Sequence, residues 1–94
     1  SLIVCPDRVI EDWQPDHVDA LEEAHFEAIL ALSPEVVLLG TGQQLRFPAV
    51  EVYAALIRSG TGVEVMDTGA ACRTYNILMG EGRRVVAGLI FTSG

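Results

Sequence analysis

The chain has 94 residues, half of them hydrophobic, and a formal net charge of −7 at pH 7. This length suits one domain that buries roughly 60–65% of the surface exposed by the unfolded chain. All six basic residues are arginines, and only Arg83 and Arg84 are adjacent. Nucleic acids and anionic membrane surfaces require clustered cations, so the composition argues against both classes of partner. No apolar run approaches the ~20 residues of a membrane-spanning helix, so we expect no membrane insertion.

Two cysteines, Cys5 and Cys72, lie far apart in the sequence and do not form the framework of a small secreted scaffold. We therefore expect both to be unpaired thiols in a reducing compartment, with a cytoplasmic location. Together with His17 and His25 they lack metal-ligand spacings such as CxxC or HxxxH. We expect neither a metal site nor any other cofactor.

The N-terminal third is predicted to contain a strand, an irregular segment and a helix. Residues 1–5 are apolar and begin as if inside a strand, which Pro6 stops. Residues 8–19 are polar and irregular, and Trp13 among them is expected to fold back as a lid on the edge of the core. A helix is expected over residues 22–32, because apolar side chains recur there at helical spacing: Phe26, Ile29 and Leu30.

The middle of the chain reads as strand, helix and strand. Residues 36–39 are a buried apolar strand, followed by the tight turn 40–42. A helix is expected to begin at Pro48 and end at Gly60, with an apolar stripe formed by Val50, Tyr53, Ala54 and Ile57. The next strand covers residues 63–66. A single connecting helix of this kind joins parallel neighbouring strands.

The last part of the chain predicts a helix over residues 70–79 and a strand over 85–91, which is apolar enough to be covered on both faces. Thr68 is expected to be the N-cap of the helix, since its hydroxyl can accept from amides of the first turn. The predicted core draws on all these elements: Val37, Leu39, Ile57, Val65, Val86 and Leu89.

Three stretches of the sequence resemble the Mth938-like family of small α/β proteins. They are PEVVLLGTG at 34–42, MDTGAACRTYNIL at 66–78 and EGRRVVAGLI at 81–90. The resemblance implies an α/β fold with a small mixed β-sheet and helices packed on it, in a single domain over 1–94 that lacks most of the family's N-terminal strand region. The family includes a mitochondrial complex I assembly factor, so the resemblance also implies a protein partner. It implies no particular chemical activity.

A candidate site follows from the parallel strands, because ligands sit outside the carboxyl ends of such strands. The turn 40–42 and the segment 67–69 leave the two strand ends and are expected to lie side by side. Backbone amides at the start of the Pro48 helix, or the Arg73 guanidinium, are the candidates to hold a small anionic ligand. The candidate ligand-binding residues are Thr41, Gly42, Asp67, Thr68, Arg73 and Asn76.

Catalysis is the less favoured interpretation of this site. Cys72 is the candidate nucleophile, since the start of a helix and the neighbouring Arg73 would promote its reactivity. Asp67 is the candidate general base, although the favoured role for it is to cap the helix and pair with Arg73. A cysteine enzyme also needs a base beside the thiol, and nothing in the sequence places His17 or His25 there. Two functions stay open: a non-enzymatic interaction or assembly protein, and a ligand-binding protein or thiol enzyme that uses a pocket between the two loops.

Overall fold

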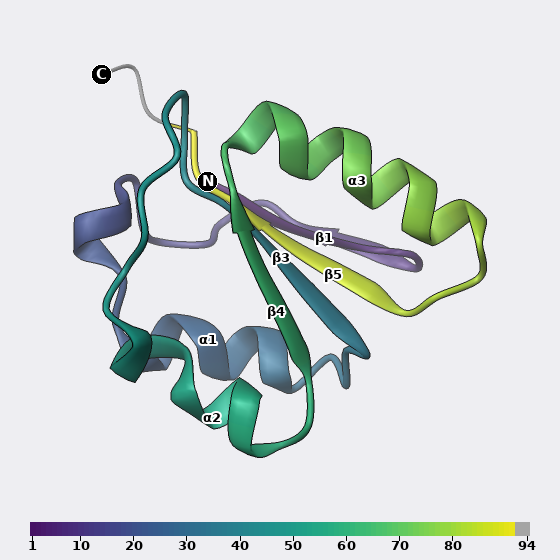
Figure 1. Cartoon of the computed structure of the whole chain (residues 1–94), viewed down its shortest axis with the longest axis horizontal. Coiled ribbons are helices and arrows are strands. Elements are labelled where there is room, and N and C mark those ends of the chain that lie inside the picture. Colours follow the sequence, from purple (N-terminus) through teal and green to yellow (C-terminus); the bar gives the residue numbers. More distant parts are fainter. Residues whose placement is uncertain (92–94) are drawn as a thin grey trace.

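The computed structural model describes residues 1–91 and contains one five-stranded mixed sheet with helices on both faces (Figure 1). The strands are β1 (Leu2–Cys5), β2 (Arg8–Ile10), β3 (Val36–Gly40), β4 (Gly62–Met66) and β5 (Val85–Leu89). The α-helices are α1 (Glu23–Leu30), α2 (Ala54–Arg58) and α3 (Thr68–Gly80), and short 3-10 helices form at η1 (Val18–Ala20) and η2 (Val50–Tyr53). The predicted α/β fold with a small mixed sheet is confirmed.

The sheet has the order β2-β1-β5-β3-β4. Strand β3 runs parallel to both β4 and β5, whereas β1 is antiparallel to β5 and to β2. The predicted parallel pairing of 36–39 with 63–66 is therefore confirmed, with Val37 opposite Val63 and Leu39 opposite Val65. Every residue of β3 and β5 is buried, as their continuous apolar sequences predicted.

Two hydrophobic clusters lie on the two faces of the sheet. Helices α1 and α2 cover one face, where the buried side chains of Phe26, Ile29 and Leu56 meet Val37, Leu39 and Val86. Helix α3 covers the other face, where Ala71 packs with Leu38, Val85 and Leu89 (Figure 1). Because side chains alternate along a strand, β3 and β5 supply both clusters at once.

The N-terminal segment is more regular than the sequence indicated. Residues 8–19 were predicted to be irregular, which is wrong at their start, because β2 pairs with β1 in a hairpin that places Ile10 opposite Ile3. The predicted role of Trp13 is confirmed: its ring is buried in the core cluster on the α1 face. Its indole N–H donates a hydrogen bond to the carbonyl oxygen of His25 at 3.0 Å, so this polar atom is satisfied.

The predicted helix from Pro48 to Gly60 is wrong in its first half. Residues 50–53 form the 3-10 helix η2, and the α-helix α2 covers only Ala54–Arg58. The predicted apolar stripe is also rotated, since Ile57 is 50% exposed and Leu56 is the buried residue. Val65 is half-buried rather than buried, while Val37, Leu39, Val86 and Leu89 are core residues as predicted.

Gly88 lets Trp13 reach the sheet. A Cβ on Gly88 would lie 2.8 Å from Cη2 of the Trp13 ring and 3.1 Å from Cδ1 of Ile29. Real Cβ atoms do not approach other atoms so closely, so any side chain here would displace the indole. The position requires glycine for the space it leaves, within an otherwise apolar strand.

Replacing Gly88 with alanine should therefore destabilise the protein by ~1–3 kcal/mol, the cost of overpacking a core. Gly80→Ala is the matched control, because a Cβ there meets nothing within 4 Å at the end of α3. It should stabilise by up to ~1 kcal/mol through helix propensity. Urea unfolding monitored by the fluorescence of Trp13, the single tryptophan, measures both. Equal stabilities of the two variants would contradict the packing described.

Candidate functional site

The two loops of the predicted site do lie side by side, and Thr68 joins them. The backbone N–H of Thr68 donates to the carbonyl oxygen of Gly42 at 2.8 Å, and the N–H of Gly42 donates back to the Thr68 hydroxyl at 2.8 Å. The same hydroxyl donates to the carbonyl oxygen of Ile90 at 2.7 Å. One side chain thus holds together the segments that follow β3, β4 and β5.

The backbones pack closely enough at this point to require glycine. A Cβ on Gly40 would lie 2.9 Å from the Cα of Thr68 and 3.1 Å from the Leu89 side chain. Two backbone hydrogen bonds also join these segments: the Thr41 N–H donates to the Met66 carbonyl oxygen at 2.9 Å, and the Ile90 N–H donates to the Gly40 carbonyl oxygen at 2.9 Å. The Thr41 hydroxyl is buried and donates to the Gln44 carbonyl oxygen at 2.6 Å. The first loop is therefore closed on itself.

Asp67, not Thr68, is the N-cap of α3. Its carboxylate accepts from the Ala70 N–H at 2.8 Å, and Thr68 is the first helical residue. The prediction of Thr68 as the cap was wrong because both residue types suit the position, and the Thr68 hydroxyl is instead used between the loops. In the first turn the amides of Thr68, Ala70 and Ala71 all have partners. The Gly69 amide is the one amide of that turn that has no hydrogen-bond partner among residues 1–91.

Arg73 does not pair with Asp67, so the prediction of an ion pair between these two residues is wrong. Among the described residues no salt bridge joins the two, although an Asp67 carboxylate oxygen and an Arg73 guanidinium nitrogen lie 3.4 Å and 3.5 Å from a Cβ position on Gly69. Arg73 is exposed. The carboxylate satisfies the helix start instead, where negative charge also suits the helix dipole.

Cys72 lies between two hollows on the α3 side of the sheet. The first, of about 330 Å³, is lined by Gly42, Gln43, Thr68, Gly69, Cys72, Ile90 and Phe91. The second, of about 280 Å³, is lined by Val4, Cys72, Tyr75, Asn76 and Leu89. Burial raises the pKa of the Tyr75 phenol above its ordinary value, with smaller contributions from Cys5 and Asp7. Of the predicted site residues, Gly42 and Thr68 border one hollow and Asn76 the other.

Neither histidine lies beside the Cys72 thiol. His25 belongs to α1, which covers the opposite face of the sheet from α3 (Figure 1). Its Nδ1 accepts from the Glu22 N–H at 3.0 Å, and Nδ1 of His17 accepts from the Asp19 N–H at 3.1 Å. Both cysteines are free thiols, as predicted. Within residues 1–91, no three His, Cys, Asp or Glu side chains are grouped as a metal site requires.

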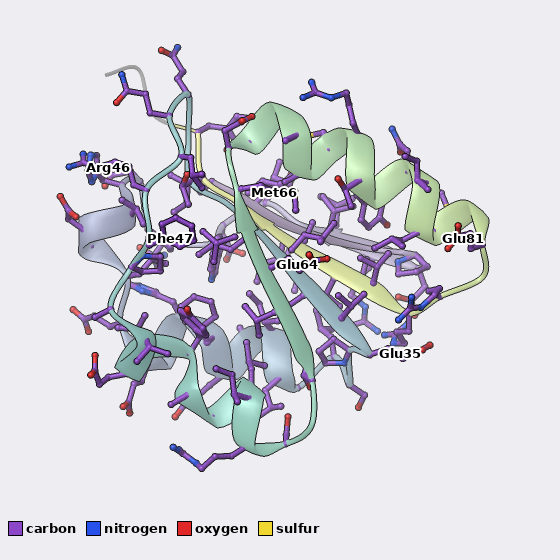
Figure 2. All side chains as sticks on the ribbon, viewed as in Figure 1. Glu35, Arg46, Phe47, Glu64, Met66 and Glu81 are labelled. Atoms are coloured by element: carbon purple, nitrogen blue, oxygen red, sulfur yellow. The ribbon has the colours of Figure 1, made fainter. Side chains whose placement is uncertain are left out.

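Sequence reasoning missed the exposed apolar side chains, and it assigned two of them, Val50 and Ile57, to the apolar stripe of a helix. The segment between β3 and α2 exposes Leu45, Phe47 and Val50, and Phe47 is 72% exposed. Figure 2 labels Phe47 and the neighbouring Arg46 on this segment. The sequence does indicate that this segment is not helical, because Gln43, Gln44 and Pro48 interrupt the helical periodicity before residue 50.

A protein family accounts for nearly the whole chain. The family model described as "Protein of unknown function (DUF498/DUF598)" matches residues 1–90. The chain belongs to this family. A Bordetella pertussis member described as a Mth938-like domain is 31% identical and superposes with a TM-score of 0.83, covering 95% of this chain and 72% of that one. The resemblance to the Mth938-like family is thereby confirmed.

Other proteins similar to this chain carry different names. A Xanthomonas campestris protein is 46% identical with a TM-score of 0.87, over 95% of this chain and 67% of its own. The "13 kDa major membrane protein" of Francisella tularensis is 36% identical over 89% of this chain and 69% of its own length. Human "NADH dehydrogenase [ubiquinone] 1 alpha subcomplex assembly factor 3" is 37% identical over 90% of this chain. The chain spans about half of that factor, 47% of its length.

The names of these relatives raise the question of a membrane span. None of the helices in residues 1–91 is both long and apolar enough to cross a bilayer.

Substitutions at Asp67 separate capping from charge pairing. Asp67→Ala should lower the free energy of unfolding by ~0.5–2 kcal/mol, because the Ala70 amide loses its acceptor. Asp67→Asn keeps an equivalent cap and should change stability by less than about 0.5 kcal/mol. Thermal and urea melts measure both. A loss for asparagine as large as that for alanine would mean that the charge matters, as it would if Asp67 paired with Arg73.

Thr68 gives a second stability prediction. Thr68→Val keeps the shape of the side chain but leaves the Gly42 N–H and the Ile90 carbonyl without their partner, so it should cost ~1–3 kcal/mol. Thr68→Ser retains the hydroxyl and is the matched control. Hydrogen exchange of the Gly42 amide should accelerate in the valine variant and not in the serine variant. Unchanged exchange in both would contradict the bridging role.

Proposed function

We propose that this protein is a non-enzymatic protein-binding module of the assembly-factor kind. The observation that carries the proposal is how the candidate site uses its polar groups. Thr41, Thr68 and Asp67 direct their side chains to backbone groups of the loops themselves, within 2.6–2.8 Å. A site built to bind or transform a small molecule needs such groups aimed at the ligand.

The surface supports the same proposal. Within residues 1–91, eight large apolar side chains are exposed: Val9, Leu45, Phe47, Val50, Ile57, Ile77, Met79 and Phe91. Three of them occur within residues 45–50, which is a concentration of apolar surface on one irregular segment. Aromatic residues such as Phe47 are enriched in protein interfaces, where the centre of the contact is apolar. The likeness to mitochondrial assembly factors adds a precedent within the family.

The alternative is a ligand-binding protein or thiol enzyme that uses the hollow beside Cys72. It is favoured by one observation: the half-buried Cys72 thiol and the unpartnered Gly69 amide both border the same hollow. A small molecule with an anionic or electrophilic group would suit them. The absence of a histidine beside the thiol weighs against catalysis by it.

Affinity capture of the tagged protein from its native cell, with matched variants, tests the two proposals. A protein partner should be retained by the unmodified chain and by Cys72→Ala. Leu45→Ser/Phe47→Ser should weaken its retention at least about tenfold, as loss of an interface anchor does. Ile77→Ser is the control, because it makes the same kind of change at another exposed residue, on α3.

Two results would overturn the proposal in favour of the alternative. One is the lack of any stoichiometric protein with the unmodified chain. The other is a small molecule that co-purifies with the protein and is lost on Cys72→Ala. Mass spectrometry of the eluted protein and of its extracted ligands distinguishes them.

A further inference from the structure

The outer edge of β4 is free in the part of the chain that the structure describes. Strand β4 ends the sheet and pairs only with β3. None of its five residues is buried, whereas β3 and β5 are buried throughout. Figure 1 shows β4 in front of the other strands, with α3 above it and α1 and α2 below. An edge strand presents a row of backbone N–H and C=O groups that another strand can use.

The two faces of β4 differ in chemistry. Val63 and Val65 point to the α1 and α2 side, where they pack against the core cluster. Glu64 points to the other side, as does Met66, which packs at the α3 cluster. Glu64 is exposed and forms no salt bridge with another described residue. Figure 2 shows Glu64 near the middle of the strand. An added strand would therefore meet two valines on one face, and Met66 and one unpaired carboxylate on the other.

We propose that the free edge of β4 binds an extended segment of a partner protein that carries arginine or lysine opposite Glu64 and an apolar residue on each side of it. Backbone hydrogen bonds would hold such a segment, and the side chains would select it. This inference rests on the proposed function as a protein-binding module and names its surface and the kind of partner.

A second copy of the unmodified chain does not fit this edge. An antiparallel pairing that overlaps all of Gly62–Met66 places Glu64 opposite Glu64. Like charges directly opposite each other destabilise a strand pair. The net charge of −7 on each copy adds a long-range repulsion. Natural edge strands use charged residues in this way against self-association. A cationic side chain turns the same carboxylate into an attractive contact.

The charge-reversed variant Glu64→Arg provides a probe, because its own β4 is an extended strand with a cation between two valines. The unmodified chain and the variant should each remain monomeric, while an equimolar mixture forms a heterodimer at least about tenfold more tightly than either self-associates. Sedimentation velocity at low and high salt measures this, and salt should weaken the complex. Amide exchange at residues 62–66 should slow only in the mixture.

Glu81→Arg is the matched control, since it makes the same change of charge at an exposed residue that follows α3, away from β4 (Figure 2). Its mixture with the unmodified chain should stay monomeric. A blocked pentapeptide of threonine and valine with a central arginine gives a second probe free of steric conflict between domains. It should shift the amide resonances of β4, and the same peptide with a central glutamate should not.

The proposal is overturned if both probes fail to engage residues 62–66, or if the sign of the central charge makes no difference to either. Equal association with the Glu81→Arg variant also overturns it, because the attraction would then be nonspecific. These outcomes are separable from the capture experiment. A retained native partner without edge pairing rejects only the edge, whereas edge pairing without any retained partner rejects the assembly function.

Discussion

The arrangement of the strand ends in this molecule depends on the hydrogen bonds of the Thr68 hydroxyl. The carboxyl ends of the parallel strands β3, β4 and β5 lie at the same end of the sheet. The chain must turn away from each of them with its backbone groups hydrogen-bonded. Thr68 uses the donor and the acceptor capacity of one hydroxyl to bond Ile90 and Gly42, and its own amide bonds Gly42 again. It is 8% exposed, so these bonds form away from water. Gly40 is needed because the backbones meet there.

The same hydrogen bonds determine which polar groups at the carboxyl ends of the strands remain free to bind a ligand. Carboxyl ends of parallel strands commonly hold ligands because their loops leave polar groups pointing outward. In this chain those groups are used between the loops, and Asp67 closes most of the first turn of α3. A hollow persists beside Cys72; of the residues that border it, Gly42, Thr68 and Ile90 are bonded to one another, whereas the Gly69 amide has no partner among residues 1–91. Bonds within the fold and binding of a ligand compete for the same few atoms here, and in this structure Thr68 and Asp67 use their side-chain oxygens within the fold.

The sequence was most informative where a single physical effect dominates. The continuous apolar runs at 36–39 and 85–91 require burial on both faces, and both strands are in the centre of the sheet. It was least informative where effects oppose one another. Residues 50–57 have helical apolar periodicity, but the β-branched Val50 and Val52 disfavour an α-helix and a 3-10 helix forms. Asp67 and Thr68 both suit an N-cap, and only the distant Gly42 and Ile90 decide between them. Strand β2 depends likewise on a partner, β1, which no local pattern reveals.

Charge explains why the free edge of β4 can discriminate between extended segments instead of binding any of them. No arginine or lysine occurs between Arg8 and Arg46, while most of the carboxylates fall in that interval, so the excess negative charge lies chiefly in the first half of the chain. Its field opposes the approach of a second copy and attracts cationic partners from a distance, an effect that falls off over about 10 Å at 0.1 M salt. Glu64 then applies the same preference at contact range, on a strand whose backbone groups favour any extended chain. Backbone groups alone would admit many sequences, and the carboxylate is what restricts them to one sign of charge.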